Sequence, residues 1–180
     1  MKDKEIGREI GIDSQTHVLG NRTVANALEH IGDALYVIAS ELQEVFQKSE
    51  TVKLKITMKE ISEYAKFVYE IAENAINAFF SENLKLANEV IRREEEAEMR
   101  GKALSEKMSL QLERGKVVSR KSTSKATLGE IDVNFRLKTI LSLLAEIANH
   151  GRSIAEVTID RTLEHENPIC KIEKIPLTGL

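Results

Sequence analysis

Cysteine and proline are nearly absent from this chain of 180 residues, which contains one Cys and two Pro. The single thiol, Cys170, cannot form an internal disulfide or a cysteine-rich metal cage, and this favours a reducing, cytoplasmic setting. Both prolines, Pro168 and Pro176, lie near the C-terminal end of the sequence. With only 9 Gly as well, the chain has few turn signals, which argues against sandwiches or barrels of many short strands.

Long hydrophobic runs and an excess of basic charge are also missing. No apolar span of about 18 residues occurs, and no apolar segment of a signal peptide follows the charged start Met1–Glu5. We therefore expect no membrane insertion. The 26 Lys and Arg are outnumbered by 29 Asp and Glu, so direct nucleic-acid binding is not expected. Hydrophobic residues reach 42%, which is enough for the core of one globular domain.

What the sequence does contain is helical periodicity in four long segments. Over residues 21–48, apolar side chains recur at alternating intervals of four and three, which is the spacing of one face of an α-helix. These side chains are Val24, Leu28, Ile31, Leu35, Ile38, Leu42 and Val45. A later segment repeats this spacing in Val133, Leu137, Ile140, Leu144, Ile147, Gly151 and Ile154.

Capping signals divide the rest of the chain. Thr57–Glu60 and Thr127–Glu130 match capping boxes, which predict helix starts. Ser81–Asn83 interrupts the periodicity and supplies capping residues for another helix, which we expect to end at Gly115. The predicted fold is all-α, an antiparallel bundle of about four long helices joined by short connections.

The predicted organisation has three parts. Residues 1–20 form a lead-in of a short helix or turn, residues 21–165 form the bundle, and residues 166–180 form an irregular tail. The stretch 114–125 is basic, contains no acid and is rich in Ser and Thr, so it predicts a loop. This loop could contact acidic partners or nucleic acid, but a solvated connection is the simpler interpretation.

Carboxylates break the pattern of the third helix. Glu94 falls within its apolar face and Glu98 near the edge of that face, and the two are neighbours at i and i+4. Two adjacent acids repel, and a cation would relieve the repulsion. The alternative is that both acids meet water or pair with Arg92 or Arg93.

A second i, i+4 pair, Glu29 and Asp33, lies away from the apolar stripe of residues 21–48. Small residues flank it, so an ion or another element could approach, although a solvated face is again the simpler interpretation. No Glu is followed by His at i+3, which argues against a di-iron oxidase. Gly-rich phosphate loops and hydrolase motifs are missing as well, so we do not expect an enzyme.

An internal repeat relates the first helix to the fourth. A shift of 116 residues aligns Leu28 with Leu144, Ile31 with Ile147, Ile38 with Ile154, and Ala39 with Ala155. Under the same shift Glu29 meets Ala145 and Asp33 meets Asn149.

These residues carry a resemblance to a known family. Leu28–Asp33, followed by Ile38 and Ala39, resembles the Leu-Glu-Arg-Ile-Gly-Asp…Ile motif of PhoU, the phosphate-uptake regulator. Ala75–Glu98 is similar to the middle of a PhoU repeat, where a helical hairpin leads into a second acidic motif. Residues 8–41 look like the archaeal branch, in which an AbrB-like DNA-binding segment commonly precedes the PhoU part; we expect that segment to be missing here.

The resemblance implies a regulator without enzymatic activity. PhoU proteins contain two three-helix repeats, so this chain would hold one full repeat and the last helix of another. The implied partners are the ATPase of the phosphate ABC transporter and a phosphate-sensing regulator such as its sensor kinase. The implied cofactors are iron or zinc ions bound by carboxylates, with Glu29, Asp33, Glu94 and Glu98 as metal ligands.

The chain departs from the family pattern in its fourth helix. Ala145 and Asn149 stand where the motif supplies Glu and Asp, and the neighbouring Glu146 and His150 point about 100° away. Neither metal site is complete in one chain, so either metal binding is lost or a homodimer completes a site. The alternative functions are an adaptor bundle that has lost metal binding and, less favoured, a carboxylate-bridged metalloenzyme.

Overall fold

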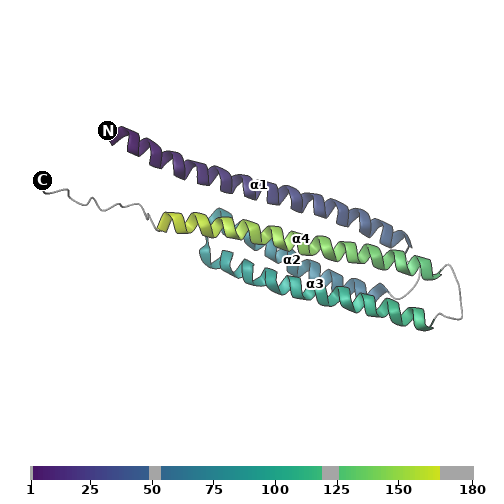
Figure 1. Cartoon of the computed structure of the whole chain (residues 1–180). Helices are drawn as coiled ribbons and strands as arrows, with labels where there is room; N and C mark the ends of the chain where they lie inside the picture. Colours follow the sequence, from purple (N-terminus) through teal and green to yellow (C-terminus); the bar gives the residue numbers. More distant parts are fainter. Residues whose placement is uncertain (1, 49–53, 119–125, 167–180) are drawn as a thin grey trace.

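A computed structural model describes residues 2–48, 54–118 and 126–166 (Figure 1). These residues form four helices and no strand: α1 (Lys2–Lys48), α2 (Leu54–Ser81), α3 (Leu84–Val118) and α4 (Ala126–Glu166). Successive helices run in opposite directions. The predicted all-α antiparallel bundle of four long helices is therefore confirmed.

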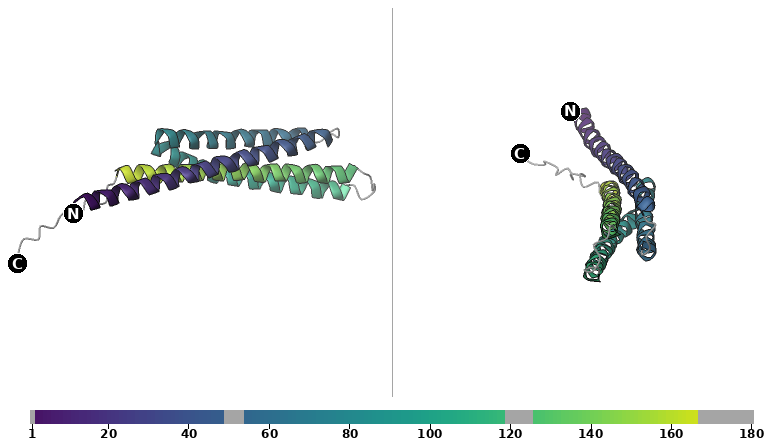
Figure 2. Two further views of the ribbon diagram at one scale, coloured as in Figure 1. Left: turned by 90° about the horizontal axis from the view of Figure 1, so that it is seen from above. Right: turned by 90° about the vertical axis from the view of Figure 1, so that its right-hand side faces the viewer.

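The helices do not form a closed square, because α4 lies at the centre of the fold. Helix α4 packs against each of the other three, and α2 also packs against α3. Within the described ranges, α1 approaches α4 closely and neither α2 nor α3. Figure 2 shows α1 crossing over α4 along the outside of the α2–α3–α4 unit. The fold is thus a three-helix unit with a fourth helix laid on its last member.

The stripe predicted for α4 forms the middle of the core. All seven of its positions, from Val133 to Ile154, are buried. Leu141, Ala148 and Ala155 widen this buried face. A helix that is covered on several sides needs apolar residues over a wide arc, and α4 has them.

The stripe predicted for α1 is buried only in part. Val24, Ile38 and Val45 are buried, whereas Leu28 is 39% exposed and Leu35 is 53% exposed. Ala27 and Ala34, which the stripe omitted, are only 4% exposed, so the real contact face lies to one side of the predicted one. One partner helix covers one narrow face, and the other half of the stripe therefore remains at the surface.

The turn between α2 and α3 has well-defined caps. Glu82 adopts φ 50°, and the amide of Asn83 donates to the Ala78 carbonyl at 3.0 Å, which closes α2 in a Schellman-type arrangement. The Asn83 side chain then accepts from the amide of Leu86 at 3.0 Å. The predicted start of the third helix at a capping residue is therefore confirmed.

Several predicted boundaries differ from the structure. Helix α1 is continuous from Lys2, whereas we predicted a short helix or turn over residues 1–20. Helix α2 begins at Leu54, before the capping box, and α3 continues past Gly115 to Val118. A glycine tolerated inside a helix explains the last difference. The rest of the basic stretch, residues 119–125, and the tail from residue 167 lie outside the described residues.

Candidate functional site

Glu94 is a buried carboxylate of α3. Its neighbours on the apolar face, Val90 and Ala97, are fully buried, and Glu94 is carried inward with them to 8% exposure. Arg152 of α4 donates from Nη1 to Glu94 Oε2 at 3.1 Å. Glu94 thus has the burial that the helical periodicity predicted. Its counter-ion comes from another helix, because that is the surface on which α3 packs.

Each member of the Glu94 and Glu98 pair has its own cation. Arg152 also donates from Nε to Glu156 at 2.9 Å, and its bonds to Glu156 and Glu94 raise its pKa above the usual value. Glu98 is exposed and accepts from Lys102 at 2.5 Å, and this bond lowers the pKa of the Glu98 carboxyl. A metal ion at this pair would have to compete with Arg152 and Lys102.

Tyr64 of α2 lies close to the same part of α3. Its side chain is buried, and its hydroxyl has no hydrogen-bond partner among the described residues. Burial, followed by the charge of Glu94, raises the pKa of Tyr64 to about 12. A Cβ atom at Gly101 would lie 2.8 Å from the Tyr64 hydroxyl oxygen. The glycine therefore leaves the room that the phenol occupies.

The second predicted pair, Glu29 and Asp33, is exposed on α1. Gly32 lies between these acids, and a Cβ there would meet nothing within 4 Å. Because α1 and α3 make no close contact in the described ranges, the structure does not bring the two acidic pairs together. Over those same ranges, no three His, Cys, Asp or Glu side chains are already arranged to hold a metal ion.

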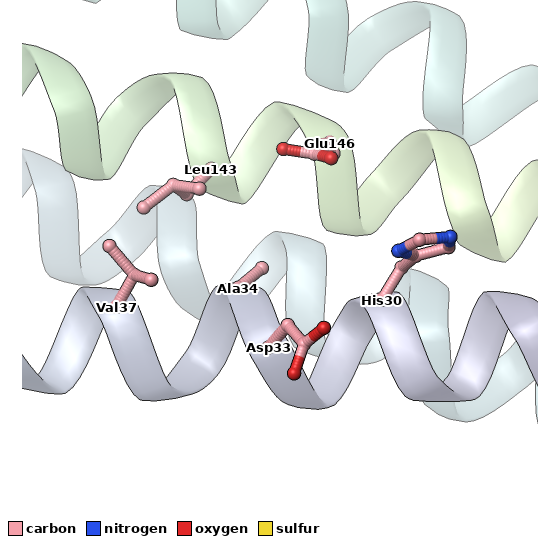
Figure 3. A pocket seen from close by; sticks show the side chains of 6 residues that line it. All are labelled: His30, Asp33, Ala34, Val37, Leu143 and Glu146. Carbon is pink, nitrogen blue, oxygen red and sulfur yellow. The ribbon is translucent and has the colours of Figure 1, made fainter.

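A different group of polar side chains meets between α1 and α4. A hollow of about 150 Å³ is lined by His30 and Asp33 of α1 and by Glu146 of α4, as Figure 3 shows. The His30 ring stacks on the ring of His150, with centroids 5.1 Å apart and planes at 13°. Sequence reasoning treated Glu146 and His150 only as substitutes for missing ligands and gave His30 no role. Their separation along the chain hid the cluster.

Comparison with known families identifies the three-helix unit. The PhoU domain model matches residues 61–158, which is more than half of the chain. The chain belongs to the PhoU family. No curated protein and no solved structure matches the chain. The match covers most of α2, all of α3 and most of α4, so the PhoU domain coincides with the packed α2–α3–α4 unit.

The PhoU match divides the predicted ligands. Glu94 and Glu98 lie inside the matched range, whereas Glu29 and Asp33 lie on α1, outside it. The PhoU family regulates phosphate uptake, and this coarse function extends to the chain. Among the described helices, none combines the length and the apolar character needed to cross a bilayer.

Helix α1 is fastened to the PhoU unit by polar contacts as well as by packing. Arg136 of α4 donates to Glu41 at 2.8 Å and lies 3.5 Å from Glu44, and the bond to Glu41 is the main cause that raises the Arg136 pKa. At the other end of α4, Arg161 reaches Asn21 at 3.3 Å. These contacts fix α1 against α4 near both ends of their overlap.

Proposed function

We propose that this chain regulates phosphate uptake through contacts with other proteins and without catalysis of its own. The observation that supports the proposal is the PhoU match over residues 61–158, which falls on the packed unit of the fold. The partners we propose are the ATPase of a phosphate ABC transporter or a phosphate-sensing kinase, met in the cytoplasm.

Co-purification tests the partner proposal. The tagged full chain is isolated from cells grown at high and at low phosphate, and the ATPase and kinase are quantified in both samples. We expect enrichment of at least one of them in one phosphate condition. If both stay at the level of an untagged control in both conditions, the adaptor function is favoured.

We also propose that carboxylate pairs of the chain bind iron or zinc. Each pair, Glu29 with Asp33 and Glu94 with Glu98, places two oxygens at i and i+4 on one helix, and carboxylate oxygens suit hard cations such as Fe³⁺. Of the two, the exposed pair on α1 has the less restricted access.

Metal analysis after mild purification tests this proposal. We expect iron or zinc that is removed by Glu29→Ala with Asp33→Ala. The control is Glu63→Ala with Glu73→Ala, which removes the same charge from exposed positions of α2. A metal-free protein whose melting temperature does not respond to added Fe, Zn or Mn would contradict metal binding.

A homodimer is the assembly we propose, because of the surface of α1. The internal repeat aligns Leu28 and Ala39 with Leu144 and Ala155 of α4. On α4 these two positions are at most 5% exposed, whereas on α1 both are exposed. The outer face of α1 thus has the sequence of a buried face, and a second copy would cover it.

An adaptor bundle that has lost metal binding is the second candidate function. The observation that favours it is the pairing of Glu94 with Arg152, which already neutralises the buried carboxylate. A buried acid with a protein counter-ion needs no metal to compensate its charge. The metal analysis above separates the two functions.

A further inference from the structure

Two imidazoles and two carboxylates face one another where α1 crosses α4. His30 and Asp33 lie one turn apart on α1, and Glu146 and His150 lie one turn apart on α4. His30, Asp33 and Glu146 line the same hollow, and His150 stacks on His30. Two nitrogens with one or two carboxylate oxygens are a donor set that Zn²⁺ binds in proteins.

We propose that His30 and His150, together with Glu146 and Asp33, form a binding site for one divalent ion of the Zn²⁺ class between α1 and α4. The site differs in chemistry from the carboxylate pairs of the proposed function, since imidazole nitrogen suits zinc and similar transition metals better than Mg²⁺ or Ca²⁺. It also differs in construction, because each helix contributes one nitrogen ligand.

The state of His150 supports the proposal most directly. Its side chain is 18% exposed, and its Nε2 atom is shielded from solvent without a hydrogen-bond partner in the described part of the chain. The closest acid, Glu146, lies 3.8 Å away from Nε2, which is too long for a hydrogen bond. A buried polar atom without a partner costs free energy. A metal ion would satisfy that nitrogen and use the nearby carboxylate.

The space between the helices suits an ion with a water ligand. The hollow of about 150 Å³ exceeds the roughly 30 Å³ that one water takes up. Zn–N bonds are about 2.0–2.1 Å long, so two nitrogens that share an ion lie within about 4 Å of each other. The stacked rings must therefore turn about their side-chain bonds to converge. His30 is exposed and free to do so without disturbing the core.

An ion held in this way would connect α1 to the PhoU unit. In the described ranges α1 packs closely against α4 alone, so ligands from these two helices would act across the whole attachment of α1. A ligand that binds only the docked arrangement stabilises it by mass action. Zn²⁺ would thereby strengthen the docking of α1 on α4.

Zn²⁺ titration of the tag-free full chain, after removal of metal by a chelator, tests the proposal. We expect one Zn²⁺ per chain by calorimetry and a rise in melting temperature on Zn²⁺ addition. His30→Ala should weaken Zn²⁺ binding by at least about tenfold and abolish the temperature shift. His17→Ala is the matched control, because it removes an imidazole of α1 outside the cluster and should leave both readouts unchanged.

Two further variants separate this site from the carboxylate pairs and from a folding defect. His150→Gln keeps most of the side-chain volume and should lose the Zn²⁺ response while retaining the helical circular dichroism of the parent protein. Glu29→Ala should keep the response. The proposal is overturned if His30→Ala and His150→Gln bind Zn²⁺ as the parent protein does, or if Glu29→Ala alone abolishes binding. The second result would instead favour the carboxylate site of the proposed function.

Discussion

At the scale of single residues, the phenol of Tyr64 and the missing side chain of Gly101 are adapted to each other. The Tyr64 hydroxyl is buried without a hydrogen-bond partner among the described residues, and such a group costs about 1–3 kcal/mol. Tyr64→Phe should therefore raise the free energy of unfolding by about 1 kcal/mol or more. Urea denaturation measures this change, and a variant less stable than the parent would contradict the assignment.

Gly101→Ala probes the same contact from the other helix. The added Cβ would lie 2.8 Å from the Tyr64 hydroxyl, so we expect a loss of about 1–3 kcal/mol. Combined with Tyr64→Phe, the same change should cost at least about 1 kcal/mol less, because the clashing oxygen is gone. Equal costs in the two backgrounds would show that the hydroxyl is not the obstacle.

The raised pKa of Tyr64 also predicts a dependence of stability on pH. The unfolded chain releases the phenolic proton near pH 10, whereas the folded chain holds it to about pH 12. Between these values the unfolded state binds fewer protons, so the free energy of unfolding falls as pH rises. Tyr64→Phe should reduce that slope between pH 10 and 12. An identical slope in both proteins would assign the pH dependence to other groups.

Residue roles were predictable where they depend on the helix that carries the residue. The burial of Glu94 follows from its angular position on α3, and the structure places it at 8% exposure. Its partner Arg152 lies 58 residues away, and periodicity gives no information on which face of α4 would meet α3. The stacking of His30 on His150 escaped prediction for the same reason.

At the scale of elements, the turn after α2 depends on Asn83. Its side chain accepts a hydrogen bond from the Leu86 amide at 3.0 Å, as an N-cap residue does. Asn83→Ala should lower the free energy of unfolding by about 0.5–2 kcal/mol, whereas Asn83→Ser should lose far less because serine also caps. Thermal unfolding of the two variants compares them, and equal losses would contradict a capping role.

The existence of all four helices was predictable, but the extent of some was not. Periodicity and the Asn83 cap located α2, α3 and α4, since those signals are local. The N-terminal part of α1 lacks a sustained apolar period, so the sequence predicted a lead-in there, whereas the structure has one helix from Lys2. Helix α3 passes through Gly115 to Val118, because a single glycine lowers helix propensity without ending the helix.

At the scale of the whole molecule, the apolar outer face of α1 predicts association. Leu35 is 53% exposed on α1, and Leu110 is 54% exposed on α3. Leu35→Lys should shift the protein from dimer to monomer, because it places a charge in the proposed interface. Leu110→Lys adds the same charge at matched exposure and should leave the mass unchanged. Light scattering after size-exclusion chromatography measures both. A monomeric parent protein, or equal behaviour of the two variants, would contradict the dimer.

The central position of α4 has a consequence for synthesis of the chain. The helix that covers α1 is the last of the four to be made, and 118 residues separate the end of α1 from the end of α4. At about 5–20 residues per second, α1 leaves the ribosome roughly 6–24 s before its partner is complete. During that interval its apolar face is open to chaperones, or to a finished α4 of a neighbouring chain. The order of the helices thus makes exchange of α1 between nascent copies a competing route for this fold.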